Sequence, residues 1–303
     1  MTLRPATAAA LEKAGLDPSA IEALVTATVT EDLGGGVDVT SAATVPADQR
    51  STLDLVARAT GVVAGIPVAA AVFDVVCDGD AEITVVADDG ARVSRGDVLL
   101  TITGRTQQLL TAERSALNLL CHLSGVATAT AAWADALEGS GTRVRDTRKT
   151  TPGLRVLEKY AVRCGGGVNH RMFLSDAALV KDNHVVAAGG VAAAFDKVRE
   201  MWPGLPVEVE VDSLAQLTEV LDAGADLVLL DNFKPEQMRL AVGIAEEHAA
   251  HSGRPRCLLE ASGGLTLPDA PAVATTGVDF VAVGALTHSA PVLDIGADLR
   301  PIA

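Results

Sequence analysis

The spacing of apolar residues divides the first part of the chain into helical and strand-like stretches. Residues 7–30 predict one or two helices, the second capped by Asp17 with Pro18 in its first turn. Between Ser51 and Thr103, short apolar runs separated by Asp-Gly turns predict strands, with a buried helix within residues 61–76. Residues 106–125 return to helical spacing. This part of the chain predicts a small α/β layer domain.

After about Gly125 the pattern becomes a repeat of strand, loop and helix. Strands alternating with helices predict a parallel sheet with crossover helices. A barrel gathers the polar residues at its strand ends on one face. The expected strands lie within residues 142–147, 177–184, 206–212, 226–233, 256–264 and 279–287, the helices within 191–202, 213–224, 234–250 and 267–277, and the strand-end residues are Lys181, Glu210, Asp231, Ser262 and Gly284.

A doubly wound nucleotide-binding fold is the competing α/β architecture. Its fingerprints are missing, because the chain has no G-x-G-x-x-G after a first strand and no G-x-x-x-x-G-K-[ST]. Another class of α/β enzymes carries paired acids after an apolar strand, whereas the segment VLLDNFKPE offers one acid followed by Asn232. The sequence therefore favours a barrel.

Composition excludes several classes of partner. The 303 residues carry 24 Lys and Arg against 39 Asp and Glu, a formal net charge of −15, which disfavours nucleic acid and anionic membrane surfaces. No signal peptide is expected at the amino terminus, and the longest apolar run, residues 59–73, is too short to span a bilayer. Four widely spaced cysteines without a C-x-x-C fit a reducing cytoplasm.

Residues 146–184 gather cations among Gly-rich turns in this acidic chain. Such a cluster predicts a pocket for a multiply charged anion; the alternative is a surface of solvated salt bridges. The cations are Arg148, Lys149, Arg155, Lys159, Arg163, His170, Arg171, Lys181 and His184.

These residues also carry a family resemblance. TRKTTPGLR (147–155) and GGGVNHRMFLSDAALVKDNH (165–184) strongly resemble quinolinate phosphoribosyltransferases. The resemblance continues through EVEVDS, LVLLDNF, EASGG and VGALTHSA, and reaches back to EDLGGGVDVTS and ERSALNLL, so it spans nearly the whole chain.

The resemblance implies a fold and an activity. The fold is an incomplete α/β barrel, residues 117–288, with an N-terminal α/β layer (open sandwich) domain, residues 1–116, joined by the tail 289–303. The activity is transfer of phosphoribosyl from phosphoribosyl pyrophosphate to quinolinate with decarboxylation, giving nicotinate mononucleotide, pyrophosphate and CO₂ in cytoplasmic NAD biosynthesis.

Two glycine clusters after the last two predicted strands are candidates for phosphate binding by backbone N–H groups. A simple chain turn is the alternative. By resemblance they hold the 5-phosphate of phosphoribosyl pyrophosphate; they comprise Ser262, Gly263, Gly264, Val283, Gly284 and Ala285.

Glu210 and Asp231 end neighbouring predicted strands and are candidates for a Mg²⁺ site, since Mg²⁺ takes one or two carboxylates plus substrate oxygens and water. Contact with ribose hydroxyls is a second interpretation, and pairing with Lys149 and Lys181 is a third. We expect Lys149, Glu210 and Asp231 to be the catalytic residues.

Arg148, His170 and Arg171 are candidates for the two carboxylates of a pyridine dicarboxylate, because guanidinium forks match carboxylates in pairs. Lys149 suits pyrophosphate, and Lys181 suits the dicarboxylate. A Schiff-base role for Lys181 is the alternative.

Arg114 lies on the apolar face of the helix predicted for residues 106–125, where it needs an anionic partner. Glu113 is the local alternative. The resemblance instead implies that Arg114 contacts substrate in the neighbouring subunit, which makes a homodimer the minimum assembly and a trimer of dimers the larger alternative.

Two features have plain structural interpretations. Residues 31–46 predict a loop in which Glu31, Asp32 and Asp38 are solvated acids and not metal ligands. Cys164 is expected to be a packed residue and not a low-pKa thiol.

Three other functions compete with this one. They are a relative acting on another substrate, such as the molybdenum-transport-associated proteins similar to this family, a transferase for nicotinate, and a non-catalytic anion-binding barrel.

Overall fold

The computed structural model describes residues 3–302 and divides into two compact units. The first unit contains the residues up to Ala129, Val156–Gly166 and the tail from Ser289, and the second contains Thr130–Arg155 and Gly167–His288. Helix α5 (Thr106–Ala136) runs from one unit into the other, so the expected boundary at residue 116 falls inside a continuous helix.

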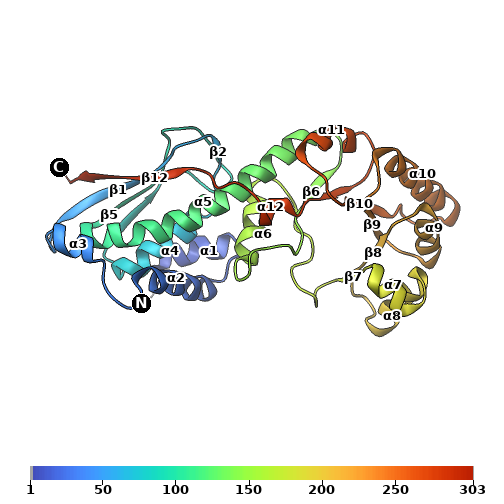
Figure 1. Cartoon of the computed structure of the whole chain (residues 1–303), viewed down its shortest axis with the longest axis horizontal. Helices are drawn as coiled ribbons and strands as arrows, with labels where there is room; N and C mark the ends of the chain where they lie inside the picture. The colour runs from blue at the N-terminus through green and yellow to red at the C-terminus, as the bar shows by residue number, and fades with distance from the viewer. Residues whose placement is uncertain (1–2, 303) are drawn as a thin grey trace. The chain divides into compact units, whose positions relative to one another are not determined.

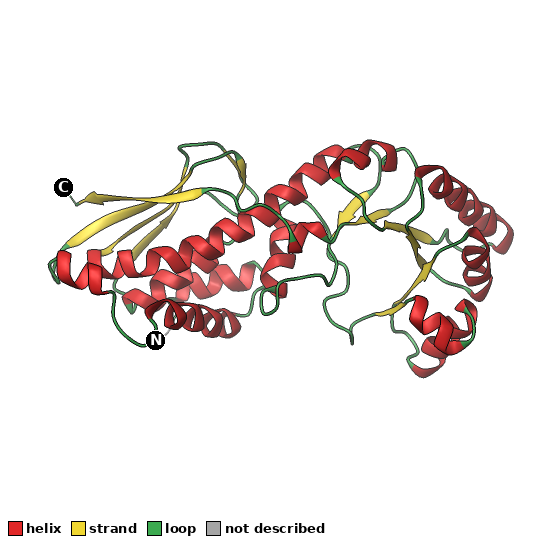
Figure 2. Ribbon diagram, viewed as in Figure 1, coloured by secondary structure: helices red, strands yellow, loops and turns green. Residues whose placement is uncertain are grey.

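The first unit contains a four-stranded antiparallel sheet in the order β12-β1-β5-β3. Its register places Leu53 between Ile102 and Leu299, so the tail of the chain adds an edge strand beside β1. Figure 2 shows this sheet beside the helices of the unit. The strands are β1 (Arg50–Ala57), β3 (Glu82–Val85), β5 (Val98–Arg105) and β12 (Ile295–Pro301), with a small ribbon of β2 (Gly61–Val62) and β4 (Arg92–Val93).

The helices of this unit follow local sequence signals. Asp17 caps α2 by accepting a hydrogen bond from the N–H of Ser19, which confirms the predicted cap. Helix α4 contacts β5, and α1 and α2 pack against α4. Every residue of α4 except Pro67 and Val76 is buried, as expected for an apolar helix. The helices are α1 (Pro5–Lys13), α2 (Pro18–Leu33), α3 (Val39–Thr44), α4 (Ile66–Cys77) and α6 (Arg155–Cys164).

The loop predicted for residues 31–46 is wrong in part. Helix α2 extends to Leu33, and α3 begins after Asp38. Asp38 accepts hydrogen bonds from the N–H groups of Thr40 and Ser41, and these bonds make it the N-cap of α3. The acid that resembled a loop residue is therefore a helix signal.

The second unit is built on a six-stranded parallel sheet in the order β6-β11-β10-β9-β8-β7. The two edges of this sheet are β6 and β7, which are the first two strands of the second unit along the chain. The curved sheet is therefore open between them. This confirms the incomplete α/β barrel. The strands are β6 (Arg143–Arg145), β7 (Ala178–Val180), β8 (Val207–Val211), β9 (Leu227–Asp231), β10 (Leu258–Ser262) and β11 (Phe280–Ala282).

The crossover helices follow the outer side of these strands (Figure 1). The structure confirms the three predicted long helices, whereas the helix expected within residues 267–277 is reduced to two short turns beside Pro268 and Pro271. No helix among residues 3–302 is long and apolar enough to cross a membrane. The helices are α7 (Asp182–Ala188), α8 (Val191–Met201), α9 (Leu214–Ala223), α10 (Pro235–Ser252), the 3₁₀ helix η1 (Leu267–Asp269), α11 (Ala270–Val273) and α12 (Ala285–His288).

Candidate active site

A cavity of about 550 Å³ lies at the carboxyl ends of the barrel strands, inside the second unit. Parallel strands bring their end residues together there, as the sequence predicted. Ten of the predicted site residues line this cavity: Arg148, Lys149, His170, Arg171, Lys181, Glu210, Asp231, Ser262, Gly263 and Gly264.

The two arginines form the cationic part of the cavity. Arg171 is fixed by a 2.8 Å hydrogen bond from Nη1 to the carbonyl of Ala177. Partial burial, together with the neighbouring guanidinium of Arg148, lowers the pKa of Arg171. The Nε atom of Arg148 is buried and has no hydrogen-bond partner in the described structure. Two guanidinium groups held close together in this way favour an anion between them.

The two carboxylates predicted at the strand ends have different partners. Glu210 forms a 2.8 Å ion pair with Nζ of Lys181, which agrees with the expectation that these acids pair internally in the absence of substrate. Asp231 instead accepts a 2.8 Å hydrogen bond from the side-chain amide of Asn232. Lys149 has no ion pair or hydrogen bond from its ammonium group within residues 3–302 and is exposed.

The glycines at the ends of β10 and β11 meet real steric demands. Gly263 has φ +108°, and a Cβ there would lie 2.2 Å from Oδ1 of Asn232, so only glycine fits. Gly284 lies against Lys149, whose Cδ would be 3.0 Å from a Cβ at this position. The hydroxyl of Thr287 donates a 2.8 Å hydrogen bond to the carbonyl of Lys149. These contacts place Gly284 and Thr287 beside Lys149, although Val283, Gly284 and Ala285 do not line the cavity.

His170 lines the cavity, but its ring nitrogens have partners inside the protein. Nδ1 accepts a 2.7 Å hydrogen bond from the N–H of Arg171. Nε2 lies 2.7 Å from a carboxylate oxygen of Glu208 and 3.6 Å from one of Glu260. The role predicted for His170 in binding a substrate carboxylate stays a prediction, because the ring would have to exchange one of these partners.

Sequence reasoning missed a buried charged group below these residues, made of Arg145, Glu208 and Glu260. Nη1 of Arg145 lies 2.6 Å from Oε2 of Glu260, which is fully buried. Burial and the nearby Glu208 raise the pKa of Glu260 to about 8. The available signal was strand alternation, since Glu208 and Glu260 precede Glu210 and Ser262 by two residues and so share their face.

Arg114 and Cys164 belong to the first unit. Arg114 is exposed on α5 and makes no ion pair with Glu113 or any other described residue, so the local alternative is wrong. Burial raises the pKa of the Cys164 thiol to about 11, which agrees with a packed cysteine of low reactivity.

A cavity at the carboxyl ends of an incomplete parallel barrel, with fixed cations beside glycine turns and strand-end carboxylates, defines a barrel enzyme for phosphorylated or carboxylated substrates. Comparison with known proteins narrows the class. The family domains "Quinolinate phosphoribosyl transferase, N-terminal domain" and "C-terminal domain" match residues 38–124 and 126–298. The chain belongs to the quinolinate phosphoribosyltransferase family.

Individual relatives agree along nearly the full length. The chain is 53% identical over 270 residues to the carboxylating nicotinate-nucleotide pyrophosphorylase of Mycobacterium leprae, covering 89% of this chain and 93% of the relative. It is 38% identical over 287 residues to the human enzyme of that name, covering 94% and 93%. The crystal structure of NadC from Streptococcus pyogenes superimposes with a TM-score of 0.88 at 39% identity, covering 95% and 99%.

Proposed function

We propose that this enzyme transfers the phosphoribosyl group of phosphoribosyl pyrophosphate to quinolinate and releases pyrophosphate and CO₂, forming nicotinate mononucleotide for NAD biosynthesis. The observation that carries the proposal is the single cavity in which guanidinium groups, strand-end carboxylates and a glycine turn converge. An anion-binding protein without catalysis gains nothing from Glu210 and Asp231 in this position.

Quinolinate is a dianion, and its two carboxylates match the cations of this cavity. Arg148 and Arg171 bind carboxylate oxygens in pairs, and each charge-assisted hydrogen bond contributes about 1.5–3 kcal/mol. Lys181 adds a third positive charge once its pairing with Glu210 is exchanged. Nicotinate has one carboxylate and would leave part of this charge without a partner, so quinolinate is the better fit.

Phosphoribosyl pyrophosphate fits the remaining groups. Ser262, Gly263 and Gly264 offer backbone N–H groups for its 5-phosphate, with Val283, Gly284 and Ala285 beside them. Glu210 and Asp231 supply hard oxygen ligands from adjacent strands, a donor set that fits Mg²⁺. When bound, Mg²⁺ would neutralise charge on the pyrophosphate group. Lys149 lines the same cavity and takes up charge on the same leaving group.

The chemistry then follows from charge development. The pyridine nitrogen attacks C1 of the ribose as pyrophosphate leaves, through a transition state of oxocarbenium character. The carboxylates of Glu210 and Asp231 stabilise the positive charge, and Lys149 stabilises the negative charge of the departing group. The quaternary ring nitrogen then accepts electron density, which allows the adjacent carboxylate to leave as CO₂.

One assay tests the reaction. Purified protein with Mg²⁺ and phosphoribosyl pyrophosphate receives quinolinate in one tube and nicotinate in another, and CO₂ and mononucleotide are measured. We expect activity with quinolinate alone. No product in either tube from folded protein would favour a relative that uses another substrate.

The assembly is part of the proposal. Arg114 is exposed and has no ionic partner among residues 3–302, which supports a homodimer in which it reaches the other subunit's substrate. Mixing inactive Arg114→Ala and Lys149→Ala subunits should restore activity through hybrid dimers, and failure despite verified subunit exchange contradicts the role. A trimer of dimers is the larger form to examine by mass measurement.

The cellular location is also part of the proposal. Four free cysteines support a cytoplasmic location.

A further inference from the structure

The proposed reaction needs a proton inside the substrate cavity. When the C2 carboxylate leaves as CO₂, the electron pair of the broken C–C bond stays on C2, which must then form a C–H bond. The guanidinium groups of Arg148 and Arg171 do not release protons at neutral pH. In the proposed complex the ammonium groups of Lys181 and Lys149 pair with a substrate carboxylate and with the pyrophosphate. A protonated carboxyl group would complete the reaction without disturbing either pairing.

Glu260 is placed to be that acid. Its side chain is fully buried on β10, yet it lines the substrate cavity, two residues before Ser262. Arg145 holds Oε2 at 2.6 Å, whereas Oε1 is buried and accepts no hydrogen bond. Nε2 of His170 lies 3.6 Å from Oε1. One oxygen is therefore anchored, and the other is left to carry a proton.

The charges around Glu260 favour its protonated form. Glu208 faces it from β8, and Asp146 lies after β6; both are buried carboxylates that oppose a negative charge on Glu260. Arg145 on β6 is the opposing positive charge. His170 is bound through Nδ1 to the Arg171 N–H, so that nitrogen carries no proton. Burial and Glu208 outweigh Arg145, and the pKa near 8 leaves Glu260 mostly protonated at pH 7.

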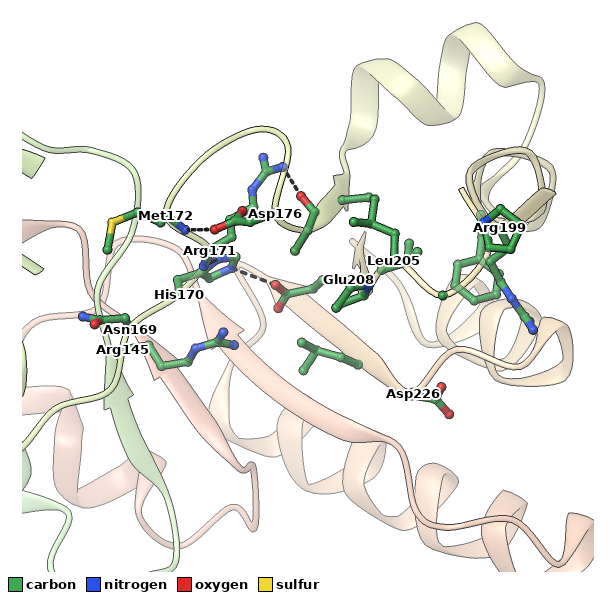
Figure 3. A pocket seen from close by; sticks show the side chains of 18 residues that line it. Arg145, Asn169, His170, Arg171, Met172, Asp176, Arg199, Leu205, Glu208 and Asp226 are labelled. Atoms are coloured by element: carbon green, nitrogen blue, oxygen red, sulfur yellow. Dashed lines mark hydrogen bonds and ion pairs between the residues drawn. The ribbon is translucent and has the colours of Figure 1, made fainter. Parts of the chain in front are cut away.

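A second cavity gives the proton a route back. Its volume is about 800 Å³, and Arg145, His170 and Glu208 line it (Figure 3). His170 and Arg171 line both cavities, whereas Glu208 lines only the second and Glu260 only the first. One atom each of His170, Glu208 and Glu260 lie within 4.8 Å of one another. The buried group thus lies between the substrate cavity and this second cavity.

We propose that Glu260 is the general acid that protonates C2 after decarboxylation, and that water in the second cavity returns a proton to it. This assignment depends on the proposed function. The Glu260 O–H bond breaks as the C2–H bond forms, and the resulting carboxylate is held beside Arg145. Water in the second cavity then supplies the next proton to this carboxylate, so one proton is consumed for each CO₂ released.

Glu260→Gln tests the assignment because it keeps the shape and removes the acid. We expect kcat to fall by about 100-fold or more, the usual contribution of a general acid, with KM for both substrates changed less than about threefold. Wild-type kcat should fall as the pH rises through about 8, when Glu260 loses its proton, and the variant should lack this decline. Glu208→Gln removes the repelling carboxylate and should move the decline to lower pH.

Asp279→Asn is the matched control, since Asp279 pairs with Arg256 and lines neither cavity; it should keep the wild-type kcat and pH profile. An active wild type with an equally active, folded Glu260→Gln variant overturns the proton-donor assignment alone. If the variant does not fold, a wild-type kcat that stays constant from pH 7 to 10 overturns it. A wild type that releases no CO₂ from quinolinate contradicts the proposed function itself.

Discussion

The two larger sheets of this protein differ in the residues that their strands bury. In the antiparallel sheet of the first unit, Leu53, Leu55 and Ile102 are almost fully buried and carry no charge. In the parallel sheet of the second unit, Glu208 and Glu260 occupy equally buried positions on the strands. Burying ions incurs a desolvation penalty that their pairing does not always offset. The antiparallel strands are packed for stability, whereas the barrel strands accept a penalty for the chemistry of their cavity.

The largest expected effect on stability is in the apolar interior. Phe73 on α4 is completely buried, and Phe73→Ala should lower the free energy of unfolding by about 3–5 kcal/mol through lost burial and a new cavity. Urea unfolding measures this loss. The neighbouring Val76→Ala, at a partly exposed position of the same helix, is the control and should lower it by much less. Equal effects of the two changes would mean that the burial of Phe73 is not what stabilises this part of the protein.

Lys149→Ala should have the opposite effect, with little change in stability and a large loss of activity. Its ammonium group has no ionic partner in the described chain, so the free energy of unfolding should change little. Activity should fall by about 100- to 1,000-fold, the usual effect of removing one group that stabilises transition-state charge. Steady-state kinetics and urea unfolding on the same preparation separate the two quantities. Lys197→Ala, an exposed lysine on α8, should leave both unchanged.

The contrast between the sheets also explains what the sequence could predict. Apolar runs and the strand–helix repeat identified the six parallel strands, because fully buried strands are the strongest local pattern. The strand-end residues were found because polar groups after an apolar run stand out, as at Lys181 and Asp231. Glu208 and Glu260 were missed because a charge within a strand usually faces solvent, and only the assembled barrel places both inside.

The sequence did not predict helix α3, for a related reason. Asp38 is both a typical loop residue and a typical N-cap, and a helix of six residues has too few positions to show a period. The orientation of the His170 ring also could not be predicted from the sequence. Its ring is turned by Glu208, 38 residues further along the chain, and by the N–H of Arg171.

A pH-dependent effect should distinguish the charged interior from the apolar one. Glu260 has a pKa of about 8 when folded against an ordinary value of 4.5, so between these values the folded state binds more protons than the unfolded state. Stability contributed by this group is therefore lost as the pH rises from about 5 to 8. The unfolding temperature of Glu260→Gln should fall less than that of the wild type over this range. Parallel curves for the two proteins would show that Glu260 is already ionised when folded.

The smallest effect on stability is expected where charged side chains pair on the surface of the first unit. Arg50, at the start of β1, lies 3.3 Å from Asp80, and both side chains are about half exposed. Exposed pairs of this kind contribute about 0–1 kcal/mol, because solvent and salt screen them. Arg50→Ala should therefore change the free energy of unfolding by less than about 1 kcal/mol, with activity unchanged and the difference reduced at high salt. A salt-independent loss of several kcal/mol would mean that this exposed pair is as sensitive to the loss of one partner as the buried pair of Arg145 and Glu260 in the barrel.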